Sequence, residues 1–361
     1  MKPKHRNVLL IGYDEHLCLS VLYCLRKEKN YNFYVLTTNE KSSAGYSRHV
    51  KGLEYVSSYD QIEKGAVKCI QQWDIDLLMP FGEKEGLAVA EAKDRLAKVC
   101  RIMPLTELNE FQIATNKKRL NNFLLSKGLR LMPQTLDLDD PDFKSKFQSL
   151  NFPLLLKPAE GAFGRGIQTL NTKEEAIMAL DEEGLDPKAL YLQEYVGGSD
   201  INCNVICEDG EIKHYTIQES PLKTLGNYNK NDDLIYKDDP AVLEVVKPML
   251  KALNYQGVAC IDLRRDVLRN KVYLLEVNAR FWGSLMASLT RAGVNFPLIM
   301  LKMGFGESAP SYHKREGKQI AASTFIKKLL KFQWPKPSEL KFWTYLHDPY
   351  ARFMKYWLQK F

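Results

Sequence analysis

The sequence predicts a mixed fold in which a doubly wound α/β domain comes first and an α+β region follows. Three observations lead to this fold class. Strand and helix patterns alternate from residue 1 to about 105, which is typical of an open, mostly parallel sheet. From about 106 to 305 the chain passes through helices, single strands and strand pairs joined by polar turns. Beyond 305 it becomes basic and aromatic.

The first domain, residues 1–105, is expected to contain strands and helices in alternation. Strands are predicted at 7–13, 32–38, 75–81 and 101–105, and helices at 16–28 and 83–99. A dinucleotide site would need Gly-x-Gly-x-x-Gly after the first strand. The run after Gly12 is Tyr-Asp-Glu-His-Leu, so the sequence does not support a nicotinamide-binding domain.

The second region opens with a helical pattern. Thr115 or Asn116 is the expected helix cap, and Gly128 the expected end. The elements predicted after it are strands at 152–158 and 189–196, a hairpin at 201–218, helices at 173–182 and 240–253, and a strand pair at 257–263 and 271–277.

Composition is that of an ordinary globular protein of 361 residues, 45% apolar and 26% charged. The seven cysteines are scattered and contain no Cys-x-x-Cys, a pattern that favours reduced thiols and a cytoplasmic location over disulfides or a zinc site. The N-terminal apolar stretch is interrupted by Gly12 and by the run Asp14–His16, which favours a first strand and helix over a signal peptide.

The strand pair carries the strongest candidate site. Glu276, Asn278 and Arg280 stand two apart, and side chains two apart on a strand share a face. Leu275, Val277 and Ala279 between them look like core. A short polar turn should pair the strands antiparallel and bring Asp262 near Glu276 and Asn278. Carboxylate and amide oxygens suit Mg²⁺, while a simple ion pair of Glu276 with Arg280 is the competing interpretation.

Two further segments have the character of a nucleotide site. Lys157 ends an apolar strand and is followed by a turn containing Gly161, Gly164 and Gly166, whose backbone N–H groups could close on phosphate. The run Gln193-Glu194-Tyr195-Val196 ends another strand, before Gly-Gly and Asp200. Read alone, each segment is better explained by an ordinary turn.

Taken in order, these motifs resemble the ATP-grasp superfamily over about residues 106–305, with 1–105 resembling its usual preceding α/β domain. "EVNARFWGSL" and "AGVNFP" resemble bacterial carboxylate–amine ligases similar to carbamoyl phosphate synthetase. The resemblance implies a pre-ATP-grasp domain at 1–105, ATP-grasp subdomains at 106–188 and 189–305, and a helical extension at 306–361.

The resemblance also implies a role for each motif residue. The phosphates of ATP would contact Lys117 and Lys157, with Gly164, Arg165 and Gly166 in a mobile flap. Adenine would lie on the backbone of Glu194 and Val196, and the ribose on Asp200. Mg²⁺ or Mn²⁺ would be held by Asp262, Glu276 and Asn278. Arg280 and Lys157 would be catalytic, with Arg280 in the role of an oxyanion arginine that D-alanine ligases carry at the position of Cys260.

The implied reaction joins a small-molecule carboxylate to an amine through an acyl phosphate, releasing ADP and phosphate. An ATP-binding accessory module without turnover is the alternative. No nucleic-acid partner is expected, and a homodimer is the assembly expected from similar ligases. The loop at 220–233 matches no known substrate motif.

The tail carries the net charge of +7. From Lys314 to Phe361, eleven Lys or Arg face three acids and are mixed with aromatic side chains. This composition suits peripheral contact with a membrane surface, whereas a C-terminal helix packed on the body with its lysines in water is the favoured interpretation.

Overall fold

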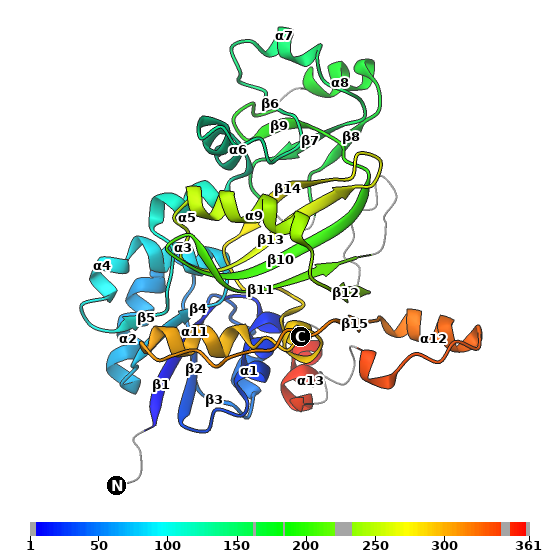
Figure 1. Ribbon diagram of the computed structural model, residues 1–361. Helices are drawn as coiled ribbons and strands as arrows, with labels where there is room; N and C mark the ends of the chain where they lie inside the picture. Colours follow the sequence, from blue (N-terminus) through cyan, green and yellow to red (C-terminus); the bar gives the residue numbers. More distant parts are fainter. Residues whose placement is uncertain (1–4, 162–163, 183–184, 221–232, 341–346, 359–361) are drawn as a thin grey trace.

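The computed structural model describes residues 5–161, 164–182, 185–220, 233–340 and 347–358. Within these ranges the strands form sheets of five, six and four strands. In Figure 1 the five-stranded sheet lies at the bottom, the six-stranded sheet crosses the middle and the four-stranded sheet is at the top. The predicted mixture of a parallel α/β sheet with later antiparallel strands is confirmed.

The five-stranded sheet is parallel and has the order β3-β2-β1-β4-β5. Val8 and Leu10 of β1 pack on the side of helix α1, while Leu9 and Ile11 pack on the side of α2 and α3. Apolar side chains on both faces explain why β1 reads as a continuous apolar run. The bounds are β1 Arg6–Ile11, β2 Tyr31–Thr37, β3 Val50–Tyr55, β4 Leu77–Pro80, β5 Arg101–Ile102, α1 Glu15–Leu25, α2 Ile62–Trp73, α3 Glu83–Glu91 and α4 Lys93–Leu96.

Two predicted helices are each divided in the structure. The helix expected at 83–99 breaks at Ala92, whose backbone leaves the helical region with ψ near 6°. The helical region after 106 forms α5 (Leu108–Thr115) and α6 (Lys117–Ser126) around Asn116, which is extended. Of the two predicted caps, Asn116 is confirmed, because its side chain accepts a hydrogen bond from the Arg119 N–H at 3.0 Å.

The four-stranded sheet is antiparallel, in the order β6-β9-β7-β8. Its strands are β6 Thr135–Asp137, β7 Leu154–Pro158, β8 Gln168–Leu170 and β9 Leu190–Glu194, and it is accompanied by α7 (Phe143–Phe147) and α8 (Lys173–Leu180). Leu154, Leu156 and Leu192 form its core with apolar residues of both helices. A domain boundary between 188 and 189 would therefore separate β9 from its own sheet.

The six-stranded sheet has the order β14-β13-β10-β11-β12-β15. The long strands β10, β11, β13 and β14 carry its apolar face toward α9 and the core that it shares with α5 and α6. The bounds are β10 Gly198–Glu208, β11 Glu211–Glu219, β12 Leu234–Tyr236, α9 Pro240–Ala252, β13 Gly257–Asp266, β14 Lys271–Asn278 and β15 Gly317–Gln319.

Two helices after β14 join the sheets into one body. α10 (Leu285–Thr290) and α11 (Phe296–Gly304) pack against α1 of the N-terminal domain. Trp282 and Phe296 are buried there, with ring centroids 4.7 Å apart in an edge-to-face arrangement.

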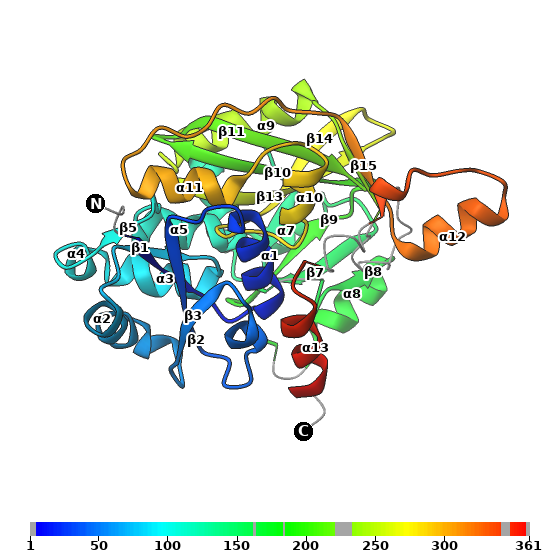
Figure 2. The ribbon, with the colours of Figure 1, turned by 90° about the horizontal axis from the view of Figure 1, so that it is seen from below.

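The C-terminal region divides into two helices with different surroundings. α12 (Ala322–Leu330) has no buried residue and stands away from the body in both ribbon views (Figures 1 and 2). α13 (Pro349–Leu358) instead packs on the short helix η1 (Ser43–Tyr46), with Ala351 fully buried. Of the two helices, α13 therefore lies against the body and α12 does not. In the described residues no helix is both long and apolar enough to cross a bilayer.

Candidate active site

A cavity of about 800 Å³ lies where the three sheets approach one another, a volume in the usual range for small-molecule sites. Its walls come from the N-terminal domain, from the four-stranded sheet and from the six-stranded sheet. Most of the predicted site residues line it: Lys117, Lys157, Gly164, Arg165, Asp200, Asp262, Glu276, Asn278 and Arg280. The structure therefore brings together side chains up to 163 positions apart, from Lys117 to Arg280.

The predicted strand pair forms, and its acids are direct neighbours. β13 and β14 are antiparallel, with Asp262 opposite Glu276 and Cys260 opposite Asn278. A β-bulge shifts the register between Asp262 and Leu263, so Leu263 lies opposite Leu274.

Because of the bulge, one of the three residues predicted to lie in the core does not. Leu274 is fully buried in the core, while Leu275 is half-buried and lines the cavity. A bulge inserts one residue into one strand and so reverses the alternation on its two sides. Val277 and Ala279, which follow the bulge, are buried as predicted.

The two carboxylates have opposite pKa shifts. Burial and the neighbouring Glu276 charge raise the pKa of Asp262 well above its usual range. Burial acts to raise the pKa of Glu276, but the combined effect of Lys117, the hydrogen bond with Asp262 and the Lys157 charge lowers it. The Lys117 Nζ lies 2.9 Å from Glu276 Oε2. Two carboxylates held side by side repel each other, so a cation placed between them would be bound favourably.

A chain of amide and hydroxyl groups orients Asp262. Asn202 of β10 donates to Asp262 Oδ1, and the Gln218 amide donates to Asn202 Oδ1 at 3.0 Å. Ser284 donates in turn to Gln218 Oε1 at 2.8 Å. Asn202 and Gln218 were not singled out from the sequence, because they meet Asp262 only through the register of β10, β11 and β13.

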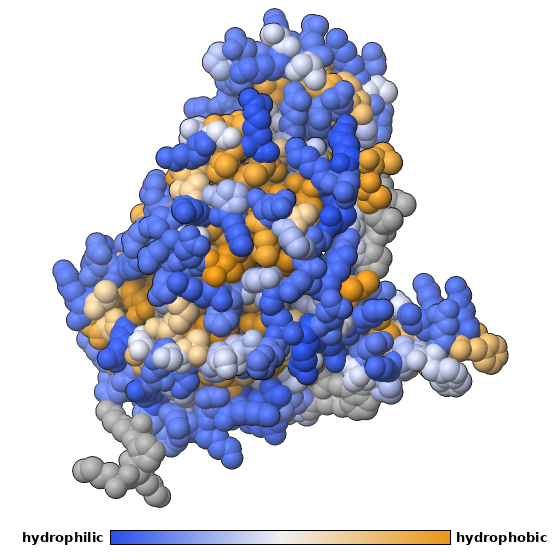
Figure 3. Space-filling view, viewed as in Figure 1, coloured by the Kyte–Doolittle hydropathy of each residue, from blue (hydrophilic) through white to orange (hydrophobic). Residues whose placement is uncertain are grey.

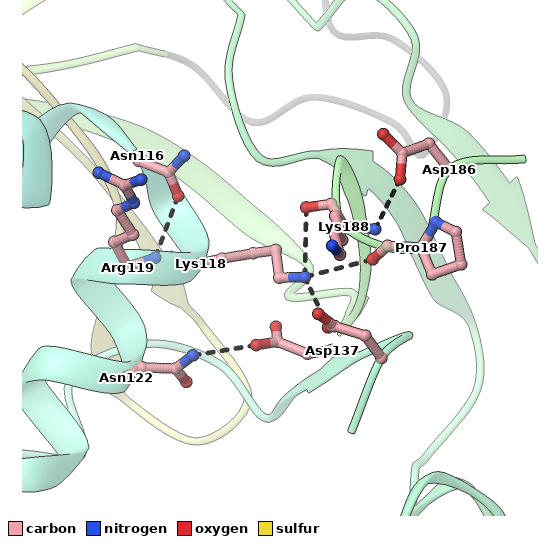
Figure 4. A network of polar contacts seen from close by, with 9 residues as sticks. Asn116, Lys118, Arg119, Asn122, Asp137, Asp186, Pro187 and Lys188 are labelled. Carbon is pink, nitrogen blue, oxygen red and sulfur yellow. Dashed lines mark hydrogen bonds and ion pairs between the residues drawn. The ribbon is translucent and has the colours of Figure 1, made fainter. Parts of the chain in front are cut away.

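Adjacent lysines at the start of α6 have different roles. Lys117 turns to the cavity and donates to the Gly161 carbonyl at 2.9 Å. Lys118 turns to the four-stranded sheet, where its Nζ lies 2.9 Å from Asp139 and donates to the carbonyls of Pro187 and Lys188 (Figure 4). Lys118 thus attaches α6 to the smaller sheet and holds Lys117 in place.

Lys157 is a buried cation in the cavity wall. Its Nζ donates to Gln193 Oε1 at 2.9 Å, across the β7–β9 pairing. Burial lowers the pKa of Lys157 to about 8, with Glu276 acting in the opposite direction. The charged form of a lysine that has lost its hydration in this way is stabilised by a nearby anion.

The glycine-rich turn has the backbone that a phosphate-binding turn needs. Gly161, Gly164 and Gly166 all have positive φ, at 116°, 69° and 74°. Gly161 and Gly164 line the cavity together with Arg165, whereas Gly166 is not among the lining residues. Positions 162 and 163 of the predicted flap lie outside the described residues.

The segment predicted to hold adenine, Glu194 to Val196, already forms several hydrogen bonds within the protein. The Glu194 N–H donates to the Gln134 carbonyl at 2.9 Å, and the Glu194 carboxylate accepts from Asn151. The Val196 carbonyl accepts from Arg264 at 3.3 Å. Neither Glu194 nor Val196 lines the cavity. Backbone contact of these two residues with adenine stays a prediction. It would require adenine to share or replace some of the hydrogen bonds that their backbone groups already form within the protein.

Asp200 lines the cavity but already has a cationic partner. Its Oδ1 accepts from Arg264 Nε at 3.0 Å and forms an ion pair with the same guanidinium. A carboxylate has further acceptor positions, so ribose contact stays a prediction. Arg264 was missed from the sequence because Arg264 and Arg265 look like solvent-facing turn residues.

Arg280 follows β14 and is held by its neighbours. Its guanidinium donates to the Phe281 carbonyl at 2.8 Å and to Asn278 Oδ1 at 3.3 Å. Cys260 also lines the cavity and is buried, and burial raises the pKa of its thiol well above the usual value. A neutral thiol cannot supply the positive charge that stabilises an oxyanion, so that predicted role would fall to Arg280.

The N-terminal domain supplies the part of the wall that sequence reading missed. Gly82, Glu83, Lys84 and Glu85 line the cavity at the start of α3, directly after β4. Glu83 reaches the far side of the cavity and accepts from the Ala279 N–H at 3.2 Å. Their position directly after a predicted strand could have indicated these residues, because open parallel sheets bind ligands beyond the carboxyl ends of their strands.

Comparison with protein families gives one match, over residues 186–325, to the family described as ATP-grasp in the biosynthetic pathway with Ter operon. A D-alanine–D-alanine ligase of Prochlorococcus marinus strain AS9601 is 28% identical over 164 residues, which is 41% of this chain and 46% of the relative. A carbamoyl phosphate synthase large chain of Thermoanaerobacter sp. strain X514 is 21% identical over 221 residues, 59% of this chain and 20% of the relative. The chain thus spans about half or less of these relatives.

Solved structures resemble most of the chain. The L-amino acid ligase of Bacillus licheniformis has a TM-score of 0.63 at 18% identity, over 82% of this chain and 73% of the other. The N5-carboxyaminoimidazole synthetase of Staphylococcus aureus has a TM-score of 0.68 at 15% identity, over 91% and 85%. With the family match over residues 186–325, these likenesses show that the chain resembles ATP-grasp carboxylate–amine ligases.

Proposed function

We propose that this protein is an ATP-dependent carboxylate–amine ligase that forms an amide bond through an acyl phosphate. The observation that carries the proposal is the cross-strand pair Asp262–Glu276, in one cavity with Lys117, Lys157 and Arg280. Carboxylates for a divalent cation and lysines for phosphate are the groups that phosphoryl transfer uses for charge neutralisation and positioning.

The residues present fit a bound Mg²⁺ or Mn²⁺. The donors are all hard oxygens, from Asp262, Glu276 and the Asn278 amide. Among the residues that the structure describes, no group of three His, Cys, Asp or Glu could hold a metal ion by itself. Triphosphate oxygens and waters would complete the shell, as is usual for Mg²⁺. When bound, the ion neutralises charge on the transferred phosphoryl group.

The chain's own groups would place ATP across the cavity. Lys117 and Lys157 would contact its phosphates, with the turn Gly164–Gly166 closing over them. Glu194, Val196 and Asp200 remain the proposed contacts for adenine and ribose. Solved neighbours support the binding of a nucleotide with Mg²⁺, since one biotin carboxylase structure from Hydrogenobacter thermophilus is described with MgADP and bicarbonate.

The proposed reaction has two balanced steps. A substrate carboxylate oxygen attacks the γ-phosphorus, forming an O–P bond while the bond to ADP breaks. An amine nitrogen then attacks the acyl carbon, the C–O bond to phosphate breaks and the nitrogen releases a proton to solvent. Arg280 would stabilise the charge on the acyl phosphate and on the tetrahedral oxyanion.

The proposed partners are small molecules, and the proposed assembly is a homodimer. The Hydrogenobacter thermophilus biotin carboxylase domain is described as a dimer, which supports that assembly. A peripheral membrane contact of the tail gains no support from the comparisons.

Glu276→Ala tests the function directly. Loss of this carboxylate should lower ADP formation at least about a hundredfold, because contacts of this kind are worth that much in the transition state. The assay supplies Mg-ATP, a carboxylate panel and hydroxylamine, which traps an acyl phosphate as a hydroxamate. Turnover by Glu276→Ala at the wild-type rate would refute the metal assignment, and AMP in place of ADP would refute the acyl phosphate.

The control is Glu211→Ala on the same sheet. Glu211 is exposed at the start of β11, where its Oε1 lies 3.8 Å from Lys251 Nζ in a surface ion pair. Its loss should leave turnover unchanged, because such pairs contribute little. Circular dichroism of both variants checks that the fold is retained.

A further inference from the structure

Residues 321–340 form an arm that leaves the body and returns to it. At the base of the arm, the Ile320 N–H donates to the Glu339 carbonyl at 3.0 Å. The Asp233 carboxylate holds the start of α12, because it accepts from the Ala321 N–H at 2.8 Å. The arm is thus held at both ends, while α12 between them has no buried residue and stands away from the body (Figures 1 and 2).

The helix of the arm, α12, has two chemically different faces. Its large apolar side chains recur at the spacing of one helix face, and its lysines at the spacing of the opposite face. The apolar set is Phe325, Ile326, Leu329 and Leu330, and the lysine set is Lys327, Lys328 and Lys331. Ile326 and Leu330 are 56% and 76% exposed, so the described part of the chain does not cover the apolar face. An exposed apolar face of this kind marks a surface that binds a partner.

The turn after α12 presents two large aromatic side chains to solvent. Phe332 is 85% exposed and Trp334 is 82% exposed. Phe332 has a φ of 54°, the left-handed conformation that glycine usually takes at the end of a helix. A bulky residue in this backbone conformation is unfavourable for the fold alone and points to a function of the side chain. Figure 3 shows apolar surface at this tip.

The arm is also basic. It contains a single acid, Glu339, and four lysines: Lys327, Lys328, Lys331 and Lys336. Three of these lysines, at 327, 331 and 336, are exposed. Residues 1–313 together are close to neutral, so the net charge of +7 belongs to the C-terminal region that holds the arm.

An anionic phospholipid surface is the partner that matches both faces of α12. Lysines lie among lipid headgroups, and apolar and aromatic side chains enter the boundary with the acyl chains, when a helix binds in the plane of a membrane. A second copy of this chain could cover the apolar face, but lysine is depleted at protein interfaces and the near-neutral body offers little countercharge. A nucleic acid would pair with the lysines and leave Ile326 and Leu330 in water.

We infer that the arm binds the surface of an anionic bilayer, with Phe332 and Trp334 entering the interface. This surface is separate from the cavity, and its role does not depend on the proposed ligase function. Binding should increase with the fraction of acidic lipid and decrease with salt, because part of the attraction is electrostatic.

Sedimentation of the full chain with vesicles tests the inference. The vesicles contain phosphatidylcholine alone or mixed with phosphatidylserine. The wild type should bind the mixed vesicles at least about tenfold more strongly at about 0.1 M salt, and this preference should weaken at about 0.5 M salt.

Two double variants separate the contributions of the arm. Phe332→Ala with Trp334→Ala should weaken binding to the mixed vesicles at least about tenfold, because two interfacial aromatic side chains are lost. Lys327→Gln with Lys331→Gln should weaken it about fivefold for each lysine removed.

Each double variant has a matched control on another part of the surface. Val267→Ala with Leu268→Ala removes two apolar side chains that are 57% and 98% exposed in the turn between β13 and β14. Lys98→Gln with Lys144→Gln removes two exposed lysines outside the arm. Both controls should bind vesicles as the wild type does. Thermal melts should show that all four variants are folded.

Trp334→Phe reports where the contact is made. Phenylalanine keeps the apolar contact, so sedimentation with the mixed vesicles should be retained. Quenching of tryptophan fluorescence by brominated phosphatidylcholine in these vesicles should fall, because the indole nearest the acyl chains is gone.

Three results would overturn the inference, and each leaves the ligase function standing. The first is equal binding to both kinds of vesicle, or arm variants that bind as the wild type does. The second is a loss of binding in the lysine variant alone, or unchanged quenching in Trp334→Phe, either of which would show charge attraction without insertion. The third is dissociation of a dimer by Phe332→Ala with Trp334→Ala in light scattering without lipid, which would assign the arm to a second copy.

Discussion

Lys157 combines burial with a role in binding phosphate, which makes its charge sensitive to pH. Its pKa is lowered to about 8 by burial, so the side chain is cationic below pH 8 and becomes neutral above it. The affinity for a non-hydrolysable ATP analogue should therefore fall as pH rises through about 8, by at most tenfold per pH unit. Titration calorimetry from pH 6.5 to 9.5 measures this slope.

Lys157→Arg provides the control for that titration. Arginine stays protonated across the range, so the fall in affinity above pH 8 should disappear even if the absolute affinity changes. The same slope in Lys157→Arg and wild type would show that another group is responsible.

At the residue scale, sequence reasoning succeeds where chemistry is concentrated in a short segment. Asp262, Glu276, Asn278 and Arg280 could be predicted because two strands and one turn bring them together. Asn202 and Gln218 could not, because each acts through a neighbour that is distant in sequence. The alternating pattern places Leu275 in the core because a bulge is not visible in it.

At the element scale, β13 begins where the six-stranded sheet meets the N-terminal domain. Gly257 starts the strand with φ of 86°, and a Cβ there would lie 2.4 Å from the Pro104 carbonyl oxygen. This close approach of two backbones fixes β13, and with it Asp262, relative to the parallel sheet.

Gly257→Ala should therefore destabilise the protein by roughly 2–4 kcal/mol, the combined effect of a strained backbone and a steric clash. Gly128→Ala is the matched control, since Gly128 has φ of 75° but no atom within 4 Å of the place that an added Cβ would take. It should cost only about 1–2 kcal/mol, from the left-handed backbone alone. Urea unfolding compares the two. Equal stability of the variants would contradict the close approach.

The elements themselves were predictable where apolar pattern and caps agree. β1, β2, β7, β13 and β14 were found within a few residues, and Asn116 was identified as a cap. β3 and α2 were not predicted, since β3 is mostly half-exposed and has no continuous apolar run. The break at Ala92 was missed because the helical pattern continues across it.

At the scale of the whole molecule, the cavity belongs to no single sheet. The N-terminal domain supplies Glu83 and Glu85, the smaller antiparallel sheet supplies Lys157, and the larger one supplies the carboxylate pair. Which sheets face each other depends on packing between α1, α10 and α11, which local patterns do not encode.

The tail also acts at this scale. α13 is attached to the N-terminal domain by the Ser47–Asp348 hydrogen bond of 2.6 Å and by stacking of His347 on His49. α12 projects from the body, and the tip of that projection shows apolar surface (Figure 3). Leu330 at the end of α12, and Phe332 and Trp334 just after it, are 76–85% exposed. The basic and aromatic residues of the C-terminal tail thus belong to two different segments, α13, which is packed on the body, and α12, which is exposed.

The most direct measurement is a crystal structure with Mn²⁺ and a non-hydrolysable ATP analogue, using anomalous scattering to locate the metal. The account predicts Mn²⁺ within about 2.0–2.3 Å of oxygens of Asp262, Glu276 and Asn278, bridging to phosphates beside Lys117 and Lys157. Metal and triphosphate bound elsewhere, with Asp262 and Glu276 facing only each other, would contradict it.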